Sequence, residues 1–158
     1  MSMTFSQKQV LILCGLASAA LLLAAFGFEH LGGFPPCKLC LWQRWPHVGV
    51  LAFCLLGALG LLRLDLALLM IALCALITTV IAGYHVGVEL EFWPGPASCS
   101  TATTSMSTSA LLDNLLATPV VRCDEIAWSF AGISMAGWNM LFSSSLVFFA
   151  ILTCRKTN

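Results

Sequence analysis

Cysteines are the residues in this sequence best suited to redox chemistry. Cys37 and Cys40 form a Cys-x-x-Cys motif, the spacing found in thiol–disulfide oxidoreductases. Arg44 stands four residues beyond Cys40, so on a helix the two side chains share a face. A guanidinium there, with a helix N-terminus nearby, would favour the Cys40 thiolate, which is the reactive form of cysteine. The motif therefore predicts a reactive dithiol.

A second pair, Cys99 and Cys123, stands in the longest polar stretch of the chain. With Cys37 and Cys40 it makes an even set of cysteines outside the apolar runs, which predicts two disulfides on an oxidising side of a membrane. Disulfides in exposed segments are typically labile and catalytic, so two dithiols on one face indicate an electron relay. The other cysteines lie in apolar runs and are expected to pack as small hydrophobic side chains: Cys14, Cys54, Cys74 and Cys154.

Two other readings of the four polar-segment cysteines are open. They could bind zinc or copper, although structural zinc sites usually gather paired cysteines and one pair here is split by 23 residues. They could instead form disulfides that only hold the loops together. We expect no metal.

Composition places the chain in a membrane. Hydrophobic residues make up 59% of it and charged residues only 9%, with a mean hydropathy of +0.95. Soluble proteins carry far more charge. The net charge is zero and no basic block is present, so nothing points to nucleic acid. A length of 158 residues fits a single membrane domain.

Stretches without charge are long enough for four membrane-spanning helices. We expect spans at about 9–29, 44–62, 66–87 and 136–154, with outer segments at about 30–43 and 88–135. Pro46 favours a late start for the second span, which would leave Cys40 outside the regular helix. Ala17-Ser18-Ala19 resembles a signal-peptide cleavage site, but the apolar run continues well past it, so we expect a retained anchor.

Lysine and arginine near the span ends set the orientation. A slight excess on the side of Lys8 predicts that both termini are cytoplasmic and that the four polar-segment cysteines are periplasmic. The long outer loop contains a leucine pattern at 110–116, which predicts a short amphipathic helix. That helix would lie on the bilayer or pack on the spans.

These motifs resemble the DsbB family of bacterial quinone-linked disulfide bond formation proteins over almost the whole chain. The resemblance rests on Pro36–His47 (PCKLCLWQRWPH), Trp93–Pro96, both loop cysteines and Gly132–Asn139. It implies an all-α bundle of four transmembrane helices in the bacterial inner membrane, with a long periplasmic loop. The implied activity is oxidation of a DsbA-like periplasmic thiol oxidase, with electrons passed to ubiquinone or menaquinone.

The resemblance also implies roles for single residues. Cys99 matches the cysteine attacked by the partner, in a Cys99–Cys123 disulfide. Cys123 matches the resolving cysteine, which exchanges with the Cys37–Cys40 disulfide at Cys37. Cys40 matches the cysteine that faces the quinone, and Arg44 the arginine that supports its reduction.

Two histidines are weaker candidates for the quinone side. His47 is three residues beyond Arg44 and could share its face, or it could be an interface histidine bonded to the backbone. His85 stands near the position where some family members have a quinone-side histidine. A vitamin K epoxide reductase-like enzyme is the alternative within redox chemistry, but its loop cysteines precede its Cys-x-x-Cys motif, and here Cys37 and Cys40 come first.

Overall fold

Four long helices make up most of the protein, and all are long and apolar enough to cross a membrane. The computed structural model describes residues 6–96 and 121–155. At about 1.5 Å per residue, even the shortest helices, of 21 residues, span roughly the 30 Å of a bilayer's hydrocarbon core. The chain is a multi-pass membrane protein, and the expected four-helix fold is confirmed. The helices are α1 (Gln7–His30), α2 (Lys38–Ala58), α3 (Leu64–Glu89) and α5 (Met135–Arg155).

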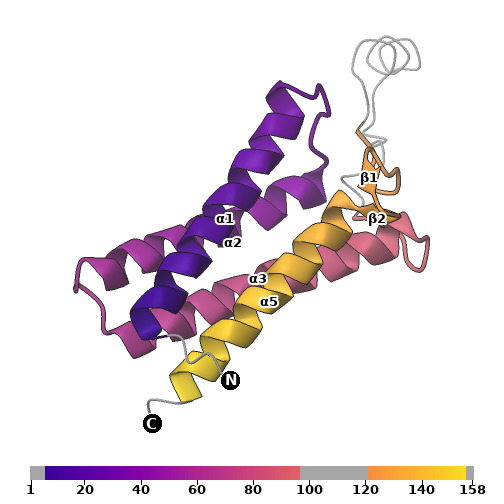
Figure 1. Cartoon of the computed structure of the whole chain (residues 1–158). Helices are drawn as coiled ribbons and strands as arrows, with labels where there is room; N and C mark the ends of the chain where they lie inside the picture. The colour runs from indigo at the N-terminus through magenta and orange to yellow at the C-terminus, as the bar shows by residue number, and fades with distance from the viewer. Residues whose placement is uncertain (1–5, 97–120, 156–158) are drawn as a thin grey trace, which may run out of the picture.

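Helix α3 is the central element of the bundle. It packs along both α5 and α2, while α1 packs mainly on α2 (Figure 1). The start of α1 and the finish of α5 lie at one end of the bundle, which we call the terminal end. The segment between α1 and α2 and the connection that precedes α5 lie at the other, which we call the outer end. The amphipathic helix expected at 110–116 lies outside the described residues.

Helix α2 differs from the expected second span at both of its ends. It begins at Lys38 instead of about 44, because Cys37 caps it and Pro46 is accommodated inside the helix. Membrane helices tolerate internal proline when neighbouring groups satisfy the freed backbone. It ends at Ala58 instead of about 62, because Gly60 adopts a φ of 72° and turns the chain out of the helix. The early start places Cys40 in the first turn of α2.

A short hairpin, which the sequence did not predict, leads into α5. Strands β1 (Ser129–Phe130) and β2 (Ile133–Ser134) pair antiparallel around Ala131 and Gly132. Both turn residues have positive φ, the conformation of a tight two-residue hairpin turn. Ser134 then accepts a hydrogen bond from the backbone of Gly137 at 3.1 Å, which caps α5. The hairpin thus fixes where the last span starts.

The chain that leaves α3 folds back onto that helix through Trp93. The Trp93 indole N–H donates to the backbone oxygen of Tyr84 at 2.9 Å, and the two rings stack. The Tyr84 hydroxyl donates in turn to the backbone oxygen of Pro94 at 2.9 Å. A Cβ atom on Gly87 would lie only 2.0 Å from the Trp93 ring, so this seat requires glycine.

Buried residues form two separate clusters. The apolar core joins all four helices, and its members include Cys14, Cys54, Ile71, Leu68 and Ala150. The second cluster, which we call the cysteine cluster, consists of Cys37, Leu39, Val88 and Cys123. Large apolar side chains such as Leu23 and Val80 point outward from the helices, as expected for a surface that faces lipid.

Candidate active site

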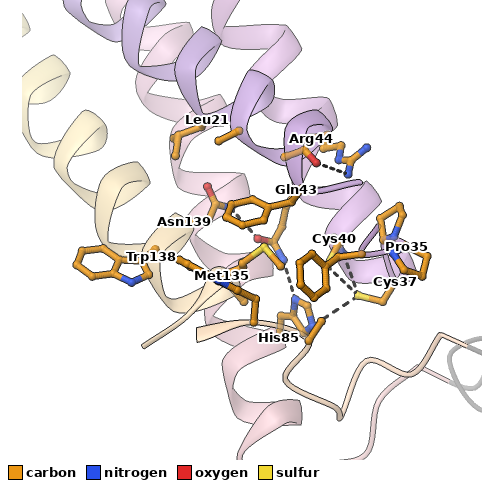
Figure 2. Close-up of a pocket in the computed structure, with 18 of the residues that line it drawn as sticks. Leu21, Pro35, Cys37, Cys40, Gln43, Arg44, His85, Met135, Trp138 and Asn139 are labelled. Atoms are coloured by element: carbon orange, nitrogen blue, oxygen red, sulfur yellow. Dashed lines mark hydrogen bonds between the residues drawn. The ribbon is translucent and has the colours of Figure 1, made fainter. Parts of the chain in front are cut away.

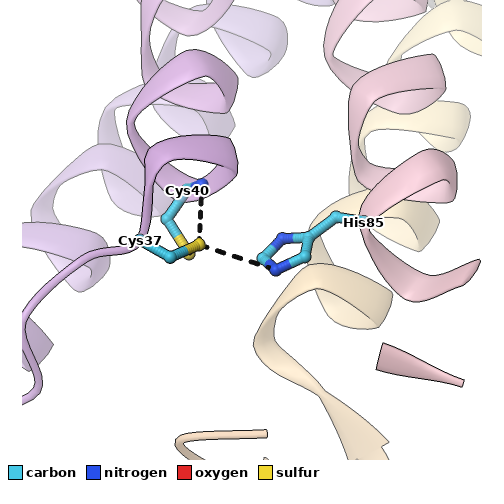
Figure 3. A group of neighbouring side chains, drawn as sticks. All are labelled: Cys37, Cys40 and His85. Carbon is cyan, nitrogen blue, oxygen red and sulfur yellow. Dashed lines mark hydrogen bonds between the residues drawn. The ribbon is translucent and has the colours of Figure 1, made fainter. Parts of the chain in front are cut away.

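The Cys-x-x-Cys pair lies where the outer end of α2 meets α3. Cys37 precedes the first turn of α2, and its sulfur accepts the backbone N–H of Cys40 at 3.3 Å. The two sulfur atoms are 3.0 Å apart and share a hydrogen bond, and neither cysteine is disulfide-bonded. From α3, the Nε2 atom of His85 approaches the Cys37 sulfur to 3.6 Å (Figure 3). Cys37 is therefore surrounded by hydrogen-bond donors.

Those donors make Cys37 acidic. The hydrogen bond from the Cys40 side chain lowers the pKa of Cys37 below that of an ordinary thiol, with further contributions from the His85 ring and the Cys40 backbone, against the opposing effect of burial. These contacts favour the thiolate form of Cys37. The sequence had led us to expect the helix N-terminus and Arg44 to favour the Cys40 thiolate. The N-terminal contacts go to Cys37 instead, because α2 begins at Lys38.

Cys123 lies beside this pair. It is buried in the cysteine cluster with Cys37, although 85 residues of sequence separate them. Its backbone also hydrogen-bonds His85. Cys123 itself is disulfide-bonded. Its expected mate Cys99 lies outside the described residues, so the Cys99–Cys123 pairing stays a prediction.

Arg44 lies one turn further along α2 and turns towards α1. Its guanidinium pairs with Glu29, donates to the Ala25 backbone oxygen at 3.4 Å and covers the ring of Phe26 at 4.8 Å. Its side chain is only 15% exposed, so it is not a lipid-facing anchor. Among the buried side-chain nitrogen and oxygen atoms of the described residues, Arg44 Nε alone has no hydrogen-bond partner. A buried donor without a partner is costly, and a ligand oxygen would satisfy it.

A cavity of about 450 Å³ connects these groups (Figure 2). Its volume lies within the range of roughly 300–1,000 Å³ that is typical of small-molecule sites. Its wall is mostly apolar, with aromatic residues such as Phe28 and Trp138. The sequence-predicted residues that line it are Cys37, Cys40, Arg44, His47 and His85. The structure thus brings both histidines to the site.

Both histidines are buried and bonded to side chains. His47 contacts Ser18 through Nδ1 at 3.2 Å and Asn139 through Nε2 at 2.9 Å, so the expected backbone bond is not its role. His85 contacts Gln43 through Nδ1 at 3.0 Å, and its Nε2 lies 3.8 Å from Glu89.

Three polar residues that contact the two histidines and line the cavity were not predicted as site residues from the sequence: Gln43, Glu89 and Asn139. A signal for them existed, because polar residues in membrane spans are costly and usually functional.

Cys37, Cys40 and His85 also carry the right atoms for a soft metal ion. Their ligand atoms all lie within 4.8 Å of one another. Cysteine and histidine together suit zinc. Proximity alone therefore permits either dithiol redox chemistry or metal binding at this position.

The chain is similar to several proteins that are described as disulfide bond formation proteins. A family model described as "Disulfide bond formation protein DsbB" matches residues 7–153. "Disulfide bond formation protein B" from Pasteurella multocida is 33% identical over 132 residues, which cover 78% of this chain and 72% of that protein. "Disulfide bond formation protein B 2" from Pseudomonas savastanoi pv. phaseolicola is 32% identical over 144 residues, covering 85% and 80%. The Aeromonas salmonicida protein of the first name is 31% identical over 147 residues, covering 87% and 84%.

Proposed function

Because the chain belongs to the DsbB family of disulfide bond formation proteins, we propose that it is a thiol:quinone oxidoreductase that reoxidises a DsbA-like periplasmic partner. The observation that carries the proposal is the position of the Cys37–Cys40 pair. On one side it packs with Cys123, which belongs to the loop. On the other it opens into a largely apolar cavity. A dithiol between a loop cysteine and an apolar cavity can take electrons from a protein and pass them to a lipid-soluble acceptor.

Electrons enter through the loop. A partner thiolate attacks Cys99, which forms a mixed disulfide and releases Cys123 as the leaving thiolate. Cys123 then attacks the Cys37–Cys40 disulfide at Cys37 and releases Cys40. The second thiol of the partner then attacks the mixed disulfide, so that the partner leaves oxidised and Cys99 is released as a thiolate. Cys99 attacks Cys123 in the Cys37–Cys123 bond, which restores the loop disulfide and releases Cys37 as a thiolate. The lowered pKa of Cys37 supports this last step, because thiols of low pKa are good leaving groups.

The cavity fits a ubiquinone or menaquinone head group. A bound quinone would accept two electrons from the Cys37–Cys40 pair, and its two protons would come from the Cys40 thiol and from solvent. Arg44 Nε offers an unpartnered N–H to a quinone oxygen, and the apolar wall accommodates a ring and its chain. Cys40 lines the same cavity and is proposed to face the ring. His47 and His85 are proposed to support this side of the site.

Redox energetics favour a quinone as acceptor. A strongly oxidising partner such as DsbA has a potential of about −120 mV, and each 30 mV in a two-electron couple is worth about 1.4 kcal/mol. The reduction potential of glutathione is too low to reoxidise such a partner. A respiratory quinone has a higher potential than the partner and dissolves in the bilayer. Because the proposed partner is periplasmic, the proposed topology has the outer end in the periplasm and the terminal end in the cytoplasm, with the bundle in the bacterial inner membrane.

The direct test is turnover by the purified full-length chain in detergent. We expect it to reduce a soluble quinone analogue repeatedly when a reduced DsbA-like protein is supplied, with one quinone consumed per partner disulfide formed. Failure to reduce quinone, by protein that still oxidises the partner once, would overturn the quinone assignment.

The order of the relay has its own test. Cys123→Ala should trap a mixed disulfide between Cys99 and the partner, because the resolving thiol is missing. Peptide mapping locates the trapped cysteine. An adduct on Cys37 would show that the proposed order is wrong.

A further inference from the structure

Buried hydrogen bonds link His85 to α2 and α5 in an unbroken series. We infer that this series holds His85 as a neutral imidazole with its proton on Nε2, and that Gln43 is the residue that positions the proton there. His85 then acts as a hydrogen-bond donor to the Cys37 sulfur and not as a base. The meaning of this role rests on the proposed function, but its test needs neither quinone nor partner.

Thr78 determines which group donates and which accepts in each hydrogen bond of the series. Its hydroxyl has one proton, which it donates to the backbone oxygen of Gln43 at 3.2 Å. Towards Asn139 it can therefore only accept. Asn139 Nδ2 lies 3.2 Å from the Thr78 oxygen, so the amide must turn its NH2 group to this side. Thr78 is fully buried, so no water competes for these bonds.

The orientation of Asn139 fixes its other contacts. The same NH2 group donates to Gln43 Oε1 at 2.6 Å. The opposite side of the amide, Oδ1, accepts from His47 Nε2 at 2.9 Å and from Ser143 at 3.2 Å. Both atoms of the Asn139 amide are thus committed, and reversing it would place its oxygen against the Gln43 and Thr78 oxygens, which both accept here.

Gln43 passes the direction on to His85. With its oxygen occupied by Asn139, Gln43 presents its NH2 group to His85 Nδ1 at 3.0 Å. Nδ1 must then be the unprotonated, accepting nitrogen, and the ring proton resides on Nε2. Gln43 is 6% exposed and His85 3%, so bulk solvent has little access to the bond between them.

The Nε2–H group faces acceptors only. The Cys37 sulfur lies 3.6 Å from Nε2, and Glu89, one turn along α3, places a carboxylate oxygen at 3.8 Å. The backbone of Cys123 is a further hydrogen-bonding group at His85. A second proton would have to enter at Nδ1, where the Gln43 N–H already points. His85 can therefore stabilise a thiolate on Cys37 without taking its proton.

The position of the His85 proton also distinguishes dithiol redox chemistry from metal binding at Cys37, Cys40 and His85. A histidine that ligates a metal through Nε2 must carry its proton on Nδ1 and donate it to a neighbour. Here Nδ1 accepts from Gln43. Without a lone pair on Nε2, His85 cannot bind a metal ion through that atom. The group of Cys37, Cys40 and His85 is then arranged for a hydrogen bond from His85 to sulfur.

The test is nitrogen NMR of the reduced full-length chain labelled with ¹⁵N-histidine, which distinguishes protonated from unprotonated ring nitrogens. We expect His85 to show an unprotonated Nδ1 and a protonated Nε2, unchanged between about pH 5.5 and 7.5, where an ordinary imidazole gains its second proton. His85→Gln assigns the signals. An Nδ1 that carries the proton, or uptake of a second proton by His85 within that range, would overturn the inference.

Gln43→Glu tests the positioning residue. The carboxylate has the same shape but can only accept, so it should move the His85 proton to Nδ1. Gln9→Glu, the same change at the exposed start of α1, is the matched control and should leave the His85 signals unchanged. If Gln43→Glu fails to fold, Gln43→Met removes the donor without adding charge and should let His85 titrate. A His85 spectrum unaffected by loss of the Gln43 donor would contradict the role of Gln43.

Discussion

Two regions of the bundle bury cysteines, and they treat them in opposite ways. In the apolar core, Cys14 and Cys54 are surrounded by aliphatic side chains, and the Cys54 thiol donates only to the backbone oxygen of Leu11 at 3.3 Å. In the cysteine cluster, Cys37 is equally buried, but its sulfur accepts the Cys40 backbone N–H, shares a hydrogen bond with the Cys40 sulfur and lies 3.6 Å from His85 Nε2. At similar burial, the two regions therefore differ in the hydrogen-bonding groups that they offer to a sulfur atom.

Polar side chains follow the same division. The series that runs through Gln43, Thr78, His85 and Asn139 lies towards the outer end. The apolar core has no comparable series among the residues that the structure describes. A membrane protein places such groups only where they are needed, because each buried polar atom must find a partner.

Replacing one cysteine in each region by alanine should give the largest difference in quinone turnover. Cys40→Ala should abolish quinone reduction, because the dithiol is lost. Cys54→Ala removes a sulfur of similar burial from the apolar core and should leave turnover near the wild-type rate, at a stability cost of about 1 kcal/mol. Steady-state quinone reduction measures the first effect and thermal unfolding the second. A Cys54→Ala variant as inactive as Cys40→Ala would erase the distinction between the regions.

Removal of the unpartnered donor should have the next largest effect. A charge-assisted contact contributes roughly 1.5–3 kcal/mol, so Arg44→Ala should lower quinone turnover about ten- to a hundredfold. Arg44→Lys should lose less, since it keeps the charge but not the planar group. Single-turnover exchange between the partner and the loop cysteines should be unchanged. Glu29→Gln is the control, because it removes the ion pair and leaves Arg44 Nε in place. An equal loss in Glu29→Gln would assign the effect to the ion pair.

The smallest effect is a difference in pH dependence. Because its pKa is lowered, Cys37 in the reduced protein should be a thiolate over much of the range between about pH 5.5 and 8, and its thiolate should disappear as the pH falls below that range. A thiol with an ordinary pKa of about 8.5 would instead gain thiolate about tenfold per pH unit over that range. Ultraviolet thiolate absorbance, with Cys37→Ser as the reference, measures this. His85→Ala should raise the pKa of Cys37, because one of its donors is lost. A Cys37 signal that rises steadily from pH 5.5 to 8 would contradict this account.

Much of the fold and part of the site could be predicted from the sequence. Charge-free runs locate four spans because a bilayer excludes charge over a fixed length. The Cys-x-x-Cys motif with Arg44 identifies the reactive end. The start of α2 could not be predicted, since Pro46 opposes a helix that packing and the Cys37 cap nonetheless favour. Gln43 and Asn139 were missed because they act in partnership across α2 and α5, and a single sequence does not show which polar residues meet.

The seat of Trp93 on Gly87 holds the start of the outer connection against the bundle. The Trp93 indole donates to the Tyr84 backbone, and the Tyr84 hydroxyl donates to the Pro94 carbonyl, so the chain up to Pro94 is tied to α3. The connection that follows α3 therefore starts from a fixed point on the membrane domain.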